Sequence, residues 1–92
     1  MKMILVINSG SSSLKFRIFG IEKSALQPVI KGEFDGIGVR PRLRAKDEAD
    51  SVLVDESYAP ENVSDVATAI QIAGHWLRET LQLEIVAVGH RV

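Results

Sequence analysis

M-I-L-V-I-N-S-G-S-S-S-L-K-F, Met3 to Phe16, places a polar, serine-rich loop between two apolar segments. Before the loop, Ile4 to Ile7 is a continuous apolar run rich in β-branched residues, which is typical of a strand covered on both faces. After the loop, apolar and basic residues alternate from Leu14 to Ile18, and this period of two predicts a second strand that ends at Gly20. The loop is therefore expected to be a hairpin turn rather than a flexible linker.

Three further strands are predicted downstream of this hairpin. The segment V-I-K-G-E-F after Pro28 alternates loosely, and D-G-I-G, Asp35 to Gly38, follows it as a turn. Arg42 to Lys46 and Ser51 to Asp55 are expected to pair through the acidic turn D-E-A-D. Because charged residues line its flanks, this second hairpin is expected to be exposed, and its basic run is interpreted as a solvated surface.

The hydrophobic period changes in the last third of the chain. Apolar residues recur at spacings of three and four, as on one face of a helix, at Val66, Ile70, Ala73, Leu77 and Leu81. With helix-start residues before them and Asp65 in the first turn, they predict a helix from Val63 to Gln82. Trp76 is expected to pack in the core, and His75 to be a structural or surface residue.

The order of these elements predicts an α/β fold. A further buried strand is expected from Glu84 to Gly89, and a strand that follows a helical crossover commonly lies parallel to its neighbour. If it pairs with Ile4 to Ile7, Asn8 and Arg91 emerge together at one carboxyl edge, where open α/β sheets bind ligands. One long helix covers only one face of a mixed sheet, so the chain is expected to be an incomplete part of a longer protein.

Composition excludes several classes of function. The chain has 92 residues, a net charge of −1 and no cysteine. The absence of a basic excess argues against a nucleic-acid partner, and the absence of cysteine excludes disulfides, thiolate metal sites and a cysteine nucleophile. The apolar run near the N-terminus is too short for a signal peptide or a bilayer span. No membrane association and a cytoplasmic location are therefore expected.

The residue types of the serine-rich loop suit an anion. Small residues let backbone N–H groups approach a phosphate, and Gly10 can adopt a positive φ that would orient them. The serine hydroxyls add donors, Lys15 adds positive charge, and Asn8 offers an uncharged oxygen ligand to a nearby Mg²⁺. This is not a Walker loop, because a leucine precedes Lys15 and a strand follows it. An ordinary hairpin turn has the same composition, so the residues alone leave both interpretations open.

Two motifs together resemble a known family. N-S-G-S-S-S-L-K-F, Asn8 to Phe16, resembles the opening signature of the acetate kinase family, which includes propionate kinases, and A-V-G-H-R-V, Ala87 to Val92, resembles the start of its second signature. The resemblance implies the ribonuclease H-like α/β fold of the acetate and sugar kinase, Hsp70 and actin superfamily. It also implies that residues 1–92 are the N-terminal portion of the first such domain of a longer enzyme.

The resemblance further implies a phosphoryl transfer. Such kinases pass the γ-phosphoryl group of ATP to a short carboxylate, acetate or propionate, giving an acyl phosphate and ADP. By this resemblance, Asn8 would help to hold Mg²⁺ (or Mn²⁺), and Arg91 would bind the substrate carboxylate. The phosphoryl group would be held by Gly10, Ser11, Ser13 and Lys15. No catalytic residue is expected within this chain, which alone is expected to be inactive, and the full-length form is expected to be a homodimer.

Two alternatives use the same residues differently. A non-catalytic module that binds phosphate or a protein partner through an exposed sheet would also account for so short a chain. A fragment of a chaperone-like or sugar kinase ATPase would normally carry an aspartate at the position of Asn8, which argues against that alternative. His90 lies beside Arg91, but the sequence does not indicate a role for it.

Overall fold

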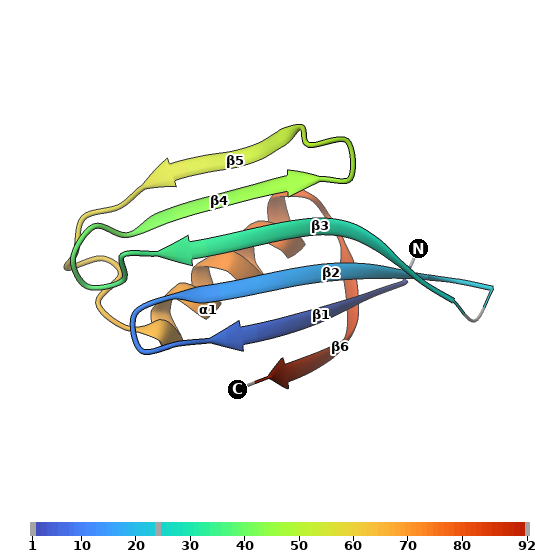
Figure 1. Ribbon diagram of the computed structural model, residues 1–92, viewed down its shortest axis with the longest axis horizontal. Helices are drawn as coiled ribbons and strands as arrows, with labels where there is room; N and C mark the ends of the chain where they lie inside the picture. The colour runs from blue at the N-terminus through green and yellow to red at the C-terminus, as the bar shows by residue number, and fades with distance from the viewer. Residues whose placement is uncertain (1, 24, 92) are drawn as a thin grey trace.

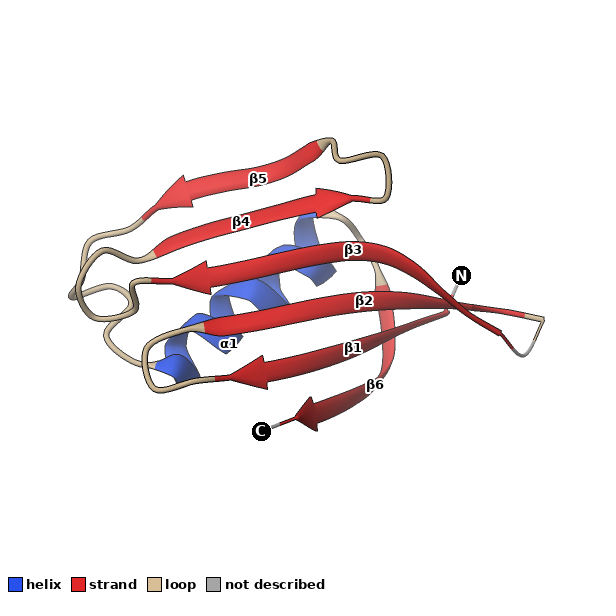
Figure 2. Ribbon diagram, viewed as in Figure 1, coloured by secondary structure: helices blue, strands red, loops and turns tan. Residues whose placement is uncertain are grey.

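The computed structural model describes residues 2–23 and 25–91, and for His90 and Arg91 it describes the backbone. Within these residues, six strands form one mixed sheet in the order β5-β4-β3-β2-β1-β6, and one α-helix, α1 (Val66–His75), lies across a single face of it (Figure 1). The strands are β1 (Lys2–Ser9), β2 (Leu14–Glu22), β3 (Ala25–Asp35), β4 (Arg42–Asp47), β5 (Val52–Ser57) and β6 (Glu84–Arg91). The sheet and its one helical layer confirm the predicted α/β class (Figure 2).

Strand β6 returns beside β1 after the helix and runs parallel to it, as the sequence predicted. The other neighbouring strands pair antiparallel. The carboxyl ends of β1 and β6 therefore lie at the same edge of the sheet, on the left of Figure 1. This edge also carries the β1–β2 turn and the β3–β4 turn.

The β2–β3 hairpin is longer than the sequence predicted. Strand β2 continues past Gly20 to Glu22, and β3 begins at Ala25, before Pro28. The ladder persists because Gly20 keeps an extended backbone and Ile21 pairs with a residue of β3. The predicted end at Gly20 was wrong, since a glycine ends a strand only where the chain turns. The hairpin consequently projects past its neighbours as an arm (Figure 1).

The β4–β5 hairpin forms where predicted, but only one of its faces is exposed. The basic residues of β4 are exposed, whereas Leu43 and Ala45 between them are both 1% exposed and belong to the core. The prediction of an exposed hairpin was wrong for this face, because alternation buries one side of a strand whatever the other side carries. Asp47 closes the turn by accepting hydrogen bonds from the backbone N–H groups of Ala49 and Ser51, at 2.9 and 3.0 Å.

The helix begins later than predicted. It starts at Val66 rather than Val63, because Asp65 is its N-cap and not a residue of its first turn. The Asp65 backbone is extended, and its carboxylate accepts a hydrogen bond from the Thr68 N–H at 2.8 Å. Hydrogen bonding from Thr68, through its side chain first and its backbone second, holds the pKa of Asp65 below its ordinary value. Val63, outside the helix, is fully buried in the core.

The end of the helix is a π-helical turn, Trp76–Thr80, which stops short of the predicted Gln82. Gln82 has a φ of 54°, the left-handed conformation in which chains commonly leave a helix. Trp76 is half-buried against the core, and His75 is exposed, as predicted. In the described part of the chain, no helix is long and apolar enough to cross a membrane.

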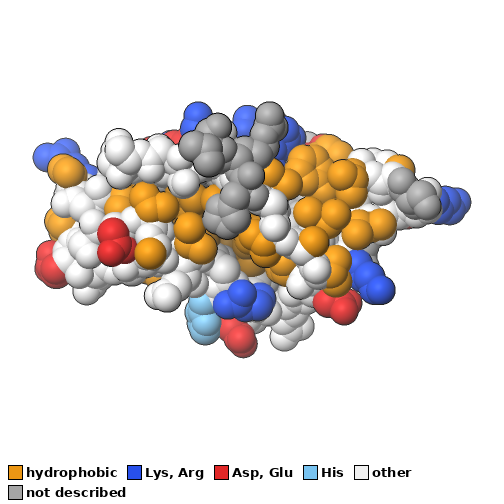
Figure 3. Space-filling model, turned by 90° about the horizontal axis from the view of Figure 1, so that it is seen from below, with side chains coloured by type: hydrophobic (Ala, Val, Ile, Leu, Met, Phe, Trp, Pro, Cys, Tyr) orange, Lys and Arg blue, Asp and Glu red, His pale blue; other side chains and the backbone are white. Residues whose placement is uncertain are grey.

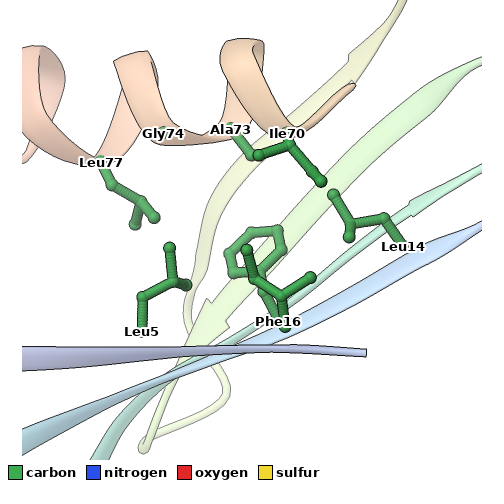
Figure 4. A pocket seen from close by; sticks show the side chains of 8 residues that line it. Leu5, Leu14, Phe16, Ile70, Ala73, Gly74 and Leu77 are labelled. Atoms are coloured by element: carbon green, nitrogen blue, oxygen red, sulfur yellow. The ribbon is translucent and has the colours of Figure 1, made fainter. Parts of the chain in front are cut away.

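The hydrophobic core lies between α1 and the strands beneath it. Leu5, Leu14 and Phe16 point toward Ala73 and Leu77 from the sheet (Figure 4). The cavity that these side chains enclose has a volume of about 10 Å³ and an almost wholly apolar lining. A space of that size holds one water at most, and a water needs polar partners. It is a packing gap rather than a ligand site.

Among the described residues, no helix lies over the second face of the sheet. Ile4 and Val6 of β1 are half-buried, and Val86 and Val88 of the edge strand β6 are 46% and 53% exposed. Hydrophobic side chains gather along this edge of the molecule (Figure 3). The predictions that β1 is covered on both faces and that β6 is buried were therefore wrong for this chain, since one helical layer covers one face only.

Candidate functional site

The candidate site is built on the β1–β2 turn, at the carboxyl end of β1. The last ladder pair before the turn joins Ser9 to Leu14, and the backbone N–H of Gly10 donates to the carbonyl oxygen of Ser13 at 2.9 Å. The serine-rich segment is thus a tight hairpin turn, as predicted. Its position is set by the strands on either side of it.

Gly10 contributes space rather than an unusual backbone conformation. Within the described residues, the glycines with positive φ are Gly36 and Gly38, so Gly10 does not use the positive φ that a glycine can adopt. A Cβ atom on Gly10 would lie 3.0 Å from the Oγ of Ser13. Because its N–H is already bonded within the turn, Gly10 offers a ligand close approach but no free backbone donor.

The serines of the turn keep their donors available. Ser11 and Ser12 are exposed and Ser13 is half-buried. Among the described residues, the N–H groups of Ser11 and Ser12 have no backbone acceptor, and the hydroxyls of the turn make no hydrogen bond to protein. Exposed donors on a tight turn are suited to an oxyanion that arrives from solvent.

The β3–β4 turn supports the β1–β2 turn from the side. The Ile37 N–H donates to the Ser12 carbonyl at 3.1 Å, and the Gly38 N–H donates to the Val63 carbonyl at 2.9 Å. Gly36 has a φ of 63°, and a Cβ there would lie 2.2 Å from the Arg40 carbonyl oxygen. The sequence identified D-G-I-G as a turn, but nothing in the spacing of its residues indicated that it would contact the serine-rich loop.

Lys15 and Asn8 face each other across the antiparallel ladder of β1 and β2. Both side chains are exposed on the sheet face opposite α1. On its other side Lys15 pairs with Glu33, whose carboxylate accepts a hydrogen bond from Arg44 at 3.0 Å. No carboxylate of the described residues lies within 4.0 Å of the Lys15 ammonium. Its positive charge is therefore available to an anion at the turn.

Arg91 pairs with Asn8 in the parallel ladder of β1 and β6. The prediction that both residues emerge at one carboxyl edge is confirmed at the level of the backbone. The side chain of Arg91 lies outside what the structure describes, so its predicted contact with a carboxylate stays a prediction. The backbone register nevertheless aligns Lys15, Asn8 and Arg91 in one row across three neighbouring strands.

A divalent metal does not fit the described residues of this site by themselves. They contain no cluster of three or more histidine, cysteine, aspartate or glutamate side chains that could hold a metal ion. Asn8 offers one neutral oxygen beside the cationic Lys15, whereas Mg²⁺ prefers carboxylate and phosphate oxygens in octahedral geometry. Any further ligands would have to come from phosphate or from other parts of a longer chain.

The geometry of the described residues agrees with a turn that faces phosphate. Comparison with known proteins decides the family to which the chain belongs. Residues 3–92 match the sequence profile of the acetokinase family. The chain belongs to that family. The match spans both motifs of the site, the β1–β2 turn and the end of β6. The family assignment and the α/β fold expected from the two motifs are thus both confirmed.

Relatives in the family are similar along the whole of this chain. It is 52% identical over 93 residues to an acetate kinase of Nitrobacter hamburgensis and 47% identical over 92 residues to one of Rhizobium meliloti. In each case all of this chain is matched, against 23% of the relative. A solved propionate kinase from Francisella tularensis superposes with a TM-score of 0.73 at 29% identity, over 100% of this chain and 22% of that structure. The chain thus spans about a quarter of the length of its relatives.

Proposed function

We propose that this chain forms the part of a kinase site that faces the transferring phosphoryl group and its acceptor. The enzyme would make an acyl phosphate and ADP from ATP and a short carboxylate, acetate or propionate. The observation that carries the proposal is the row of Lys15, Asn8 and Arg91 at the carboxyl edge of β1. This row lies beside the β1–β2 turn, residues 10–13, which we call the serine turn. Relatives that are named acetate kinase and propionate kinase support it.

The proposed reaction joins two anions, and the residues of the row offset their repulsion. A carboxylate oxygen forms a bond to the γ-phosphorus while the bond to the β–γ bridging oxygen breaks and ADP departs. Lys15 and the donors of Ser11 and Ser13 would hold the phosphoryl oxygens. The planar guanidinium of Arg91 would pair with both oxygens of the acceptor. Positioning and charge neutralisation are the main sources of rate in such transfers.

Mg²⁺, or Mn²⁺, supplies further charge neutralisation to phosphates when it is bound. We place Asn8 near it as one oxygen contact, made directly or through water. Asn8 alone does not build a divalent site, because it supplies one neutral oxygen. A cytoplasmic location, the absence of nucleic-acid and membrane partners, and a homodimeric full-length form stay predictions.

The 92-residue chain alone is expected not to turn over substrate. It spans 23% of the acetate kinase of Nitrobacter hamburgensis, and its described residues hold no carboxylate cluster at the serine turn. The test is an assay with ATP, acetate and hydroxylamine, which traps acetyl phosphate, on this chain and on the full-length protein. Acetyl phosphate made by the short chain would refute its inactivity. A full-length protein that used neither acetate nor propionate would refute the kinase proposal.

A further inference from the structure

The sheet face opposite α1 also carries a row of three cations, two residues along the strands from the row of Lys15, Asn8 and Arg91. Arg17 of β2 pairs with Lys31 of β3, and Lys31 pairs with Lys46 of β4. All three side chains are exposed on this face. Neighbouring strands lie about 4.8 Å apart, so three positive charges follow one another in a line across β2, β3 and β4.

The neighbouring row shows how the same sheet arranges charge elsewhere. There Lys15 pairs with Glu33, Glu33 with Arg44, and Arg44 with Asp55, so the sign of the charge alternates from strand to strand. Opposite charges directly across a ladder stabilise a sheet, and like charges destabilise it. The row of Arg17, Lys31 and Lys46 breaks this alternation twice. Repulsion between these like charges lowers the stability of the sheet, so the row is not explained by a contribution to folding.

The nearby carboxylates do not relieve that repulsion. Arg44 holds Glu33 and Asp35 at 3.0 and 2.9 Å, and Arg42 holds Asp55 through two hydrogen bonds of 2.8 Å. In the part of the chain that the structure describes, no carboxylate lies within 4.0 Å of the cationic groups of Arg17, Lys31 or Lys46.

The three cations line an open hollow on this face. Its volume is about 620 Å³, and its lining also includes Asn8, Lys15, Glu33 and Arg44 of the neighbouring row. The Arg17 guanidinium lies 5.4 Å from the centroid of the Phe19 ring, which steadies it at the margin of the hollow. The hollow is also lined by three acidic residues at and after the end of β4, which are Asp47, Glu48 and Asp50. They restrict an anion to the part of the hollow over β2, β3 and β4.

We propose that this row binds a condensed phosphate chain, such as a triphosphate, at a site separate from the serine turn. A condensed phosphate carries its negative charges in a line, which matches one cation per strand across three strands. An orthophosphate ion is too short to contact all three. Asn8 and Lys15 line the same hollow, but none of the three cations belongs to the Lys15, Asn8 and Arg91 row, so the proposal does not depend on the proposed kinase activity.

The test is a titration of the 92-residue chain with sodium tripolyphosphate, followed by calorimetry and by ¹H–¹⁵N correlation spectra. We expect tripolyphosphate to bind more tightly than pyrophosphate, and pyrophosphate more tightly than orthophosphate, with affinity falling steeply as salt is added. The amide signals that shift should be those around Arg17, Lys31 and Lys46. Shifts confined to Asn8 to Ser13 would overturn this proposal, and they would favour the proposed role of the serine turn.

Matched variants locate the site. Lys31→Gln and Arg17→Gln should each weaken tripolyphosphate binding roughly threefold to tenfold, since each removes a charge-assisted hydrogen bond at an exposed site. Lys23→Gln, at the tip of the arm, and Arg78→Gln, beyond α1, make the same changes of charge away from the hollow and should leave binding unchanged. Equal losses in all four variants would show a general charge effect and contradict the proposal. Tighter binding of a short single-stranded oligonucleotide than of tripolyphosphate would also contradict it.

Discussion

Asn8 and Arg91, near opposite ends of the chain, are paired neighbours in the parallel ladder of β1 and β6. Asn8 is at the same time the antiparallel partner of Lys15. One residue of β1 thus stands between a cation of the serine-turn hairpin and a cation of the last strand. If the proposed kinase activity is correct, this register is what brings the phosphoryl group and the acceptor carboxylate to one place.

The first prediction concerns Arg91 in the full-length protein. Arg91→Ala should raise the KM for acetate about tenfold to a hundredfold, because it removes a charged, two-pronged partner of the carboxylate. The KM of the Arg91→Lys variant should lie between those of the parent and Arg91→Ala, since an ammonium keeps the charge but lacks the planar fork of a guanidinium. Initial rates at varied acetate and saturating ATP measure both. Arg78→Ala, on the exposed side of the helix, is the control, and equal KM values for all variants would remove Arg91 from the acceptor site.

The second prediction concerns Lys15. Lys15→Ala should lower kcat of the full-length protein by roughly a hundredfold to a thousandfold with little change in the KM for acetate, because its charge acts on the transferring phosphoryl group. Lys23→Ala, on the β2–β3 arm, is the matched control. A kcat that stayed within twofold of the parent value in the Lys15 variant would mean that the exposed ammonium does not face the phosphoryl group.

Much of this architecture could be predicted from local patterns. The alternation from Leu14 to Ile18 and the helical spacing from Val66 to Leu81 were sufficient to predict a sheet, a crossover helix and a parallel last strand. Element ends were less predictable, because they depend on particular contacts. Asp65 could equally have been a first-turn residue, and only its hydrogen bond from Thr68 makes it the N-cap.

The candidate site was predictable where it depended on two motifs and unpredictable where it depended on strand register. The serine turn and Lys15 could be found in the sequence. The support of Ser12 by Ile37 could not, since the two residues meet only after β2 and β3 pair. The row of Arg17, Lys31 and Lys46 was hidden for the same reason: it joins three separate strands, and each basic residue alone looks like an ordinary exposed side chain.

The third prediction concerns Gly32, which pairs with Phe16. A Cβ atom on Gly32 would lie 2.1 Å from the Cζ of Phe16, whose ring rests over the glycine. Because Phe16 is 2% exposed, its ring has little space to move, and Gly32→Ala should destabilise the fold by about 1–3 kcal/mol. Urea unfolding followed by circular dichroism measures this.

Gly89→Ala is the control for Gly32→Ala, because no described atom outside the two chain neighbours of Gly89 lies within 4 Å of a Cβ built there. A smaller side chain in place of the Phe16 ring should also reduce the loss of stability caused by Gly32→Ala. In a Phe16→Leu background, Gly32→Ala should destabilise the protein less than it does in the parent. Equal costs in the two backgrounds would show that the clash with Phe16 is not the cause.

The fourth prediction concerns acid stability. The folded-state pKa of Asp65 lies below the ordinary value of 3.8, so its charged form is favoured by folding. Its contribution to stability is present above the unfolded-state pKa and is lost as pH falls through the folded-state pKa. Asp65→Asn keeps a capping acceptor but cannot titrate. The difference in urea midpoint between the parent and this variant should therefore shrink as pH is lowered from 7 to below about 3.8. Glu61→Gln, in the preceding loop, is the control, and a difference that stayed constant with pH would contradict the assignment.

The fifth prediction separates the cost of the cation row from its proposed use. Lys31→Glu places a negative charge between Arg17 and Lys46, which are its partners on either side. Each new cross-strand pair of opposite charge should contribute roughly 0.2–1 kcal/mol, so the variant should be more stable than the parent and should no longer bind tripolyphosphate. The gain should diminish in 1 M salt, where the Debye length is about 3 Å. Lys23→Glu makes the same change on the arm and should give no such gain. A Lys31→Glu protein that was no more stable than the parent would mean that the three cations do not repel one another, and the reason to expect an anion between them would be lost.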